Sequence, residues 1–245
     1  LFPDAALYTV WDPQGQRLVS TFLDPNLAGG LILVALLLSC ARLASGDLVP
    51  LWRPALLATA LVMTVSRSSM LAFVVGLVVI VFLVRRVTWR ALAGSLLAMA
   101  VCLLAAPWLW RLADSFNKFS LDDPSLLTRF VSWSRALRVL TDHPIVGVGF
   151  NTYGFVQLRY GFTELTQSAF GLDGGLLFIG VMTGFVGMTF YGILLFLVLR
   201  ACKQLWSRDR SSVVDGAIGL GVAAATVVLL IHSLFVNSIV YPPIM

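Results

Sequence analysis

A series of apolar runs close to membrane-spanning length constrains this chain more than any other feature. The hydrocarbon core of a bilayer is about 30 Å thick, and a helix needs roughly 20 apolar residues to cross it. Candidate membrane helices cover residues 27–43, 54–65, 68–84, 91–107, 174–199 and 214–236. The second run is short for a full crossing and leads into the polar sequence SRSS. The chain is 59% hydrophobic and only 12% charged, so the expected fold is an all-α, polytopic membrane helical bundle.

Charge separates the connections between these runs into two classes, because basic residues collect on the cytosolic side of membrane proteins. The first class holds nine basic residues and two acidic ones, in segments 42–53, 85–90 and 200–210. The second class holds eight basic and nine acidic residues, in segments 1–24, 66–69, 108–173 and 232–245. The classes alternate with each proposed crossing. We therefore expect 108–173 to be a large non-cytosolic loop, with the functional face periplasmic or extracellular.

Residues 1–245 are interpreted as a single membrane domain. The chain begins at Leu1 without the basic start and small-residue cleavage site of a signal peptide, so we expect an internal fragment of a longer protein. Its three cysteines are scattered without metal-ligand spacing, which predicts neither a metal site nor a disulfide framework. The excess of basic residues is explained by membrane topology, and we expect no nucleic-acid partner.

The large loop is expected to contain one amphipathic helix. In the sequence DDPSLLTRFVSWSRALRVL, Asp123 is a candidate N-cap and Pro124 a suitable first helical residue. Apolar residues recur there at helical spacing, in the stripe Leu126, Phe130, Trp133, Leu137 and Leu140. Arg129 falls beside this stripe, whereas Arg135 and Arg138 fall on the opposite face. A helix lying on the membrane surface would hold Arg129 toward the protein and leave the other two to water or headgroups.

Two polar turns at the outer ends of apolar runs are candidate binding sites. Asp24 and Asn26 open one run, where they either cap free N–H groups or, with the helix N-terminus, bind an anion. Arg67 lies in the SRSS turn between two apolar runs. An arginine near the bilayer centre costs at least about 2.5–3.5 kcal/mol, so Arg67 either snorkels to the interface or faces an internal cavity.

Two histidines and one carboxylate complete the set of candidate residues. His143 opens the glycine-rich stretch HPIVGVGFNTYG, where it either ends a helix before Pro144 or acts in catalysis. No strand precedes these glycines, so they do not indicate a nucleotide-binding loop. Asp173 stands at the outer end of an apolar run, as a helix cap or a reactive carboxylate. His232 belongs to a buried polar network or contacts substrate.

The glycines of the run 174–199 suggest a packing role. Gly180, Gly184 and Gly187 have the small-residue spacing that allows close helix contact, and we interpret them in that way.

The order of these motifs resembles the O-antigen ligase and polymerase superfamily. The similarity consists of FLDPN before a helix, SR opening another, an Arg/Trp helix followed by HPIVGVGFNTY in a large outer loop, and a polar-led helix with GFVG. It runs from about Phe22 to Met245. Members are multi-pass glycosyltransferases of the bacterial inner membrane. The resemblance implies transfer of a glycan from an undecaprenyl diphosphate carrier to lipid A–core or to another glycan, without a nucleotide sugar or a required metal.

The resemblance also implies roles for the candidate residues. Arg67 and Arg129 would bind the carrier diphosphate, since guanidinium groups bind phosphate oxygens bidentately and strongly in a water-poor site. Ligases of the family place a histidine, usually in His-Asn, where this chain has Asp173-Gly174, a departure that favours a polymerase-like or other branch. Asp173 is then the candidate base. His143 is the second catalytic candidate, and Asp24, Asn26 and His232 are weaker substrate-binding candidates.

A transporter or flippase of lipid-linked sugars is the alternative function, because it also needs basic residues in a membrane cavity. Alternating access usually rests on paired repeats and broken helices at mid-membrane. No repeat is visible in this sequence, and its polar residues collect on one side. These features favour the transferase. The sequence leaves open whether it ligates or polymerises, and which sugar, linkage and acceptor it uses.

Overall fold

Every regular element in the described part of the chain is a helix. The computed structural model describes residue 18 and the ranges 25–84, 124–150, 152–162, 172, 174–207 and 213–236. The helices are α2 (Pro25–Ala44), α3 (Trp52–Met63), α4 (Arg67–Leu83), α6 (Pro124–Asp142), α7 (Tyr153–Arg159), α8 (Gly175–Ser207) and α9 (Val213–Phe235). The all-α prediction is confirmed for these ranges.

Three of these helices are long and apolar enough to cross a membrane. They span Pro25–Ala44, Gly175–Trp206 and Val213–Leu234, while α3 and α4 are shorter apolar helices. Five of the six predicted runs coincide with these elements, and the SRSS sequence lies at the reversal between α3 and α4. The sixth run, 91–107, lies outside the described residues. The chain is therefore a helical membrane protein, as its composition indicated.

The chain forms two compact units. The first comprises residues 1–117 and 197–229, and the second comprises 118–196 and 230–245. Two of the three boundaries fall within α8 and α9, so each of these helices contributes to both units.

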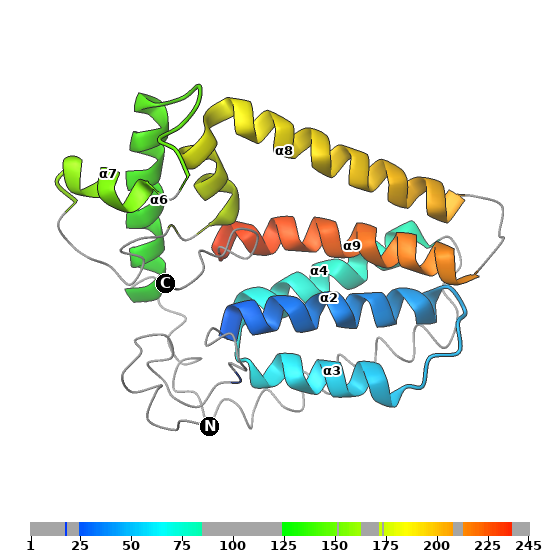
Figure 1. The fold of residues 1–245 in the computed structure, drawn as a ribbon. Coiled ribbons are helices and arrows are strands. Elements are labelled where there is room, and N and C mark those ends of the chain that lie inside the picture. Colours follow the sequence, from blue (N-terminus) through cyan, green and yellow to red (C-terminus); the bar gives the residue numbers. More distant parts are fainter. Residues whose placement is uncertain are drawn as a thin grey trace. The chain divides into compact units, whose positions relative to one another are not determined.

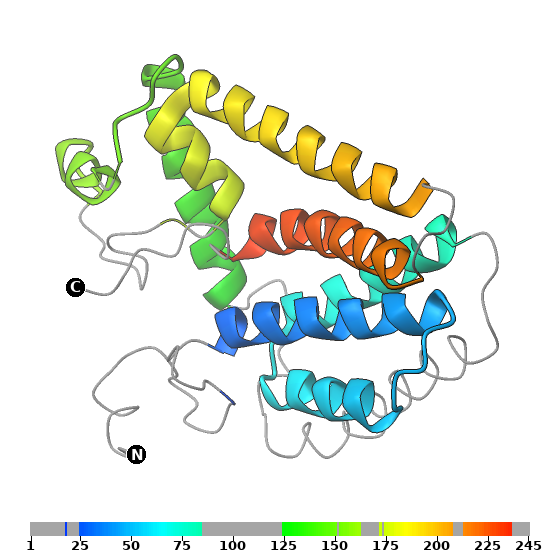
Figure 2. The same ribbon diagram turned by 45° about the vertical axis from the view of Figure 1, so that its right-hand side comes forward.

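In the first unit α2 packs against both α3 and α4 (Figures 1 and 2). Its fully buried residues include Leu33, Leu36 and Leu37, which form one apolar core with residues of α3, α4 and α9. Gly76 of α4 allows the close approach, because a Cβ built there would lie 2.6 Å from a methyl carbon of Leu37. This core holds the N-terminal ends of α2 and α4 next to each other.

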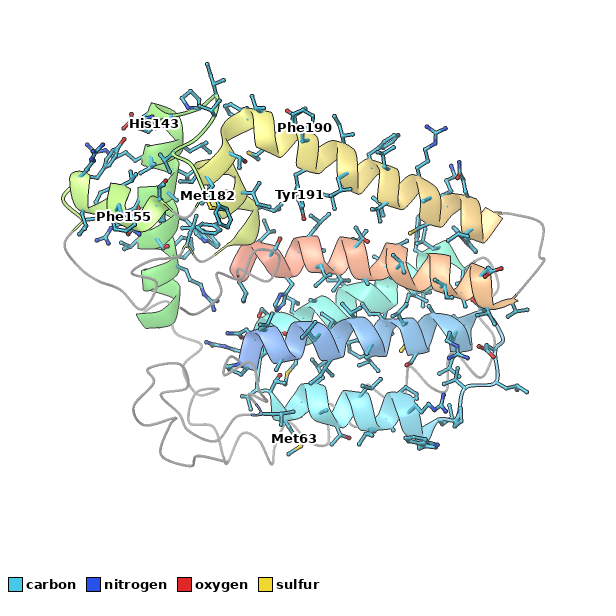
Figure 3. All side chains as sticks on the ribbon, in the orientation of Figure 1. Met63, His143, Phe155, Met182, Phe190 and Tyr191 are labelled. Atoms are coloured by element: carbon cyan, nitrogen blue, oxygen red, sulfur yellow. The ribbon has the colours of Figure 1, made fainter. Side chains whose placement is uncertain are left out.

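In the second unit α6 packs against α7 and the first half of α8. Buried Ala136 and Val139 of α6 contact a cluster that includes Tyr153, Phe178 and Met182. Figure 3 places Met182 on the part of α8 that lies beside α6.

The buried face of α6 differs from the predicted apolar stripe. Phe130 and Leu137 are 61% and 51% exposed, whereas Ser132 and Ala136 are buried. Small side chains let α6 approach its neighbours closely, so close packing, rather than the hydropathy of the largest residues, selects the buried face. Arg129 and Arg135 are both half-buried, so exposure does not separate Arg129 from the opposite face, and its predicted orientation toward the protein stays a prediction.

Helix α8 is sharply bent in the ribbon (Figures 1 and 2), and Gly184 is the residue at the bend. Its φ of 62° and ψ of −163° lie in a region essentially restricted to glycine. A Cβ at Gly184 would overlap the backbone of Ile145 and Val146. The prediction that Gly184 serves helix–helix packing is therefore wrong: its missing side chain admits a loop against an interrupted helix.

The loop that follows α6 satisfies backbone groups on both sides of this break. Val148 and Gly149 donate N–H hydrogen bonds of 2.9 Å to the carbonyls of Val181 and Met182. In the other direction, the amides of Phe185 and Val186 donate to the carbonyls of Pro144 and Ile145 at 2.8 and 3.1 Å. A broken membrane helix is tolerated where other groups bind its freed donors and acceptors. The glycine-rich stretch therefore acts as a backbone cap for both halves of α8.

Candidate functional site

The first candidate site is the turn between α3 and α4, which carries Arg67 as the first residue of α4. Ser66 is the N-cap of α4, and its Oγ accepts a hydrogen bond from the Ser69 amide at 3.4 Å. Ser66 Oγ also donates to Asn26 Oδ1 at 2.9 Å. Ser66 and Ser69 are buried, while Arg67 and Asn26 are half-buried. The turn thus joins the N-termini of α2 and α4.

The chemistry of this arrangement suits an anion. The N-terminus of a helix carries partial positive charge on its free N–H groups. Two such ends lie together here, held by the contact of Ser66 with Asn26, and Arg67 adds a full charge. A phosphate group is the kind of ligand that such a site stabilises. The structure brings together Arg67 and Asn26 of the predicted set. Asp24 lies outside the described residues.

The turn contains a strained residue that sequence reasoning did not detect. Val65 has a φ of 52°, in the left-handed region that a β-branched residue rarely adopts. Its amide donates to the carbonyl of Val62 at 2.9 Å, so it stands where glycine usually ends a helix. Strain of this kind concentrates at functional sites. A valine gives no sequence signal for this conformation.

The second candidate site lies in the second unit, where three elements meet. Trp133 of α6 lies one turn after Arg129. A Cβ built on Gly174, just before α8, would lie 3.3 Å from Trp133 Nε1 and 3.2 Å from the carbonyl oxygen of Leu234 at the end of α9. Gly174 has a φ of 117°, which only glycine adopts readily. The middle of α6, the start of α8 and the end of α9 therefore approach one another closely at Gly174.

His232 belongs to this second site. It lies on the last turn of α9 and is fully buried, as is its neighbour Ser233. The positive charge of Arg129 acts on the imidazole of His232. The structure therefore couples these two predicted site residues electrostatically. Asp173 itself lies outside the described residues, although Gly174, which follows it in the chain, is part of the site.

His143 directly follows the last residue of α6 and is labelled in Figure 3, whereas Arg129 lies in the second turn of that helix. The rise of 1.5 Å per residue separates the two by about 21 Å along the helix axis. His143 is exposed, its amide donates to the carbonyl of Val139, and its own carbonyl accepts from the Gly147 amide. These bonds terminate α6 and start the loop that caps α8.

A cluster of arginines and aromatic rings joins α6 to the end of α7. The Arg135 guanidinium lies 5.1 Å from the Phe162 ring, and that of Arg138 lies 5.9 Å from the Tyr160 ring. Tyr160 donates a hydrogen bond of 2.6 Å to Asp142, which raises the pKa of the Tyr160 phenol above its usual 10.0. The two arginines that were expected to face water or headgroups thus have aromatic partners that sequence reasoning missed.

Within the ranges that the structure describes, no group of three or more His, Cys, Asp or Glu residues could hold a metal ion.

A family model described as O-antigen ligase matches residues 55–192, more than half of the chain. The match includes the Arg67 turn, α6 and the loop that caps α8. No curated protein matches the chain.

Proposed function

Because the chain belongs to the O-antigen ligase family, we propose that it transfers a glycan from an undecaprenyl diphosphate carrier to an acceptor glycan or to lipid A–core. Family membership gives the coarser role, a membrane glycosyltransferase in polysaccharide biosynthesis. The donor, acceptor and compartment are the proposal: a lipid-diphosphate-linked sugar, used at the periplasmic or extracellular face of the bacterial inner membrane.

The observation that carries the proposal is the meeting of α6, α8 and α9 at Gly174 in the second unit. It lies beside a half-buried arginine, Arg129, and a buried histidine, His232. Gly174 directly follows the candidate base Asp173 in the chain. A cation can stabilise the charge on a leaving diphosphate, and a base can accept the proton of the acceptor hydroxyl.

Arg129 and Arg67 are the proposed ligands of the diphosphate. As the sugar leaves, negative charge grows on the phosphate oxygens, and a guanidinium in a water-poor site stabilises that charge. The two helix N-termini at Arg67 support the same role, because their N–H groups also favour a phosphate. Asn26, bonded to Ser66, is a weaker candidate contact, and Asp24 remains one on sequence grounds.

Asp173 is the proposed base. The acceptor hydroxyl oxygen forms a bond to the anomeric carbon, and the bond from that carbon to the diphosphate oxygen breaks. The hydroxyl proton passes to the Asp173 carboxylate, and the electron pair of the broken bond leaves with undecaprenyl diphosphate. His232 is buried, which favours a role in positioning Arg129 over direct contact with substrate.

His143 is not included in the proposed reaction. A group about 21 Å from Arg129 along one helix cannot act on a bond beside a phosphate that Arg129 holds. Its hydrogen bonds favour a role in ending α6. The family match does not support the flippase alternative, because the matching family model is described as O-antigen ligase.

Complementation of bacterial cells that lack either ligation or polymerisation tests the proposal. Restored attachment of whole glycan chains would indicate a ligase, and lengthened chains would indicate a polymerase. Arg67→Ala and Arg129→Ala are each expected to lower the rate by about 10²–10³, the usual effect of removing a group that stabilises transition-state charge. Arg67→Lys and Arg129→Lys should recover only part of it, because lysine cannot bind bidentately.

Arg159→Ala is the matched control, since Arg159 is exposed at the end of α7 and has no proposed role. It should keep the parental rate. Full activity in Arg67→Ala and Arg129→Ala proteins that insert at normal levels would exclude the diphosphate-binding roles. Full activity in Asp173→Asn would exclude Asp173 as the base.

A further inference from the structure

The loop that caps α8 has a second property that its backbone bonds do not explain. Ile145 and Val146 project large apolar side chains that are 67% and 69% exposed. Their backbone is fixed, because the carbonyl of Ile145 accepts from the Val186 amide and Val146 lies against Gly184. An apolar environment would stabilise two neighbouring exposed apolar side chains on a fixed backbone.

The position of the loop on α8 identifies that partner. Before Gly184, α8 is covered by protein: Phe178, Val181 and Met182 are at most 3% exposed. After Gly184, exposed apolar residues dominate: Phe185 is 59% exposed, Phe190 is 70% exposed, and both lie on a helix with the length and composition of a membrane span. The loop is hydrogen-bonded at the first turn of this exposed part. Its apolar side chains therefore continue the surface that α8 offers to lipid.

Helix length gives the depth of the loop. Arg200 is the first charged residue after the break, and a charged side chain marks the membrane boundary. At 1.5 Å per residue, Phe185 lies about 22 Å along α8 from Arg200. This is less than the hydrocarbon thickness of about 30 Å, so the break and the loop bonded to it lie at or inside the opposite edge of the hydrocarbon.

The residues that precede Ile145 and Val146 are of the types expected at the edge of the hydrocarbon region. Asp142 and His143 are exposed and polar, and Tyr160, hydrogen-bonded to Asp142, is a residue type enriched at membrane interfaces. The chain thus passes from polar groups to Ile145 and Val146 and returns through Gly147 to the α8 carbonyls. This change from polar to apolar residues is typical of a segment that enters the hydrocarbon region from the membrane interface and returns.

We propose that Ile145 and Val146 insert into the acyl-chain region of the bilayer and anchor the end of α6 there. The partner is phospholipid of the membrane that α8 crosses. The anchor would fix the depth of α6, and with it Arg129, relative to the lipid surface. This inference does not depend on the proposed glycan transfer.

Site-directed spin labelling of the protein in phosphatidylcholine and phosphatidylglycerol vesicles tests the anchor. Single cysteines at 145, 146, 143 and 190 are introduced after Cys40, Cys102 and Cys202 are replaced by alanine, and each label is relaxed by oxygen and by a water-soluble nickel chelate. Labels at 145 and 146 should match the lipid-facing control at 190, with a several-fold higher ratio of oxygen to nickel accessibility than the label at 143. A ratio equal to that at 143 would overturn the proposal.

Photo-crosslinking of the unmodified protein gives a test that needs no substitution. In vesicles with a diazirine on the phospholipid acyl chain, adducts are expected on Ile145 or Val146 and on residues 185–196. Adducts on 185–196 with none on the loop would overturn the proposal, as would capture of the loop by a second protein chain. Neither readout requires catalysis, so a failed transferase assay leaves the anchor testable.

Discussion

Replacing Gly184 by alanine tests the interrupted helix most directly. The backbone of Gly184, at φ 62° and ψ −163°, is strained for any residue with a Cβ, by about 1–3 kcal/mol. The new methyl group would also overlap the Ile145 carbonyl. The loop can move away, but it then loses the four backbone hydrogen bonds across the break, at about 1 kcal/mol each. Either response predicts a loss of about 2–4 kcal/mol in the free energy of unfolding.

Gly192→Ala is the matched control, because Gly192 lies on the same helix and a Cβ there meets nothing within 4 Å. That substitution should be neutral or should stabilise the helix by up to about 1 kcal/mol. Thermal unfolding in detergent measures the difference, and hydrogen exchange at the amides of Val148 and Gly149 reports whether the loop has left α8. The reasoning is refuted if Gly184→Ala is as stable as Gly192→Ala and both amides keep their protection.

Three further predictions concern other positions. Val65→Gly should raise the unfolding temperature or leave it unchanged. It relieves about 1–2 kcal/mol of strain in the left-handed backbone conformation and adds an entropic cost of about 0.5–1 kcal/mol for ordering a glycine. A clear fall in the unfolding temperature would show that packing of the valine side chain outweighs the strain. Gly29→Ala should lower both stability and glycan transfer, because the new Cβ would lie 2.6 Å from a serine Oγ of α4. Gly216→Ala is the control and should change neither, because a Cβ there meets open space. Equal behaviour of the two variants would contradict this prediction. The raised pKa of Tyr160 means that its hydrogen bond to Asp142 contributes stability below about pH 10 and loses it as the pH rises through the folded-state pKa. Tyr160→Phe should therefore flatten the alkaline fall in stability, and an unchanged profile in pH-dependent unfolding would contradict the assignment.

Sequence patterns predicted the elements of this protein well where one helix is determined by its own residues. The runs 27–43 and 214–236 lie within or beside α2 and α9 to within a few residues, since hydropathy over a membrane length needs no tertiary information. Pro124 was expected to begin a helix, and α6 begins there. The position of Arg67 at the first residue of α4 follows from the serine that caps it.

Prediction was weaker where contacts between distant segments decide the outcome. Gly184 has the spacing of a packing glycine, and nothing near it in sequence indicates a break. The break depends on residues 144–149, which supply the hydrogen bonds that an uninterrupted helix would make for itself. The buried face of α6 likewise depends on its neighbours, which accept Ala136 and leave Phe130 exposed.

By itself the sequence determined that this chain is a helical membrane protein with polar, charged groups gathered at particular helix ends. Hydropathy, charge and helix capping are properties of neighbouring residues, so they can be read along the chain. Only the tertiary structure decided that the glycine-rich loop caps a broken α8, that Asn26 bonds to the turn of Arg67, and that Gly174 lies beside Trp133 and the end of α9. Each of these requires backbone or side-chain groups far apart in the chain to meet at hydrogen-bonding or van der Waals distance, and such complementarity leaves no local pattern.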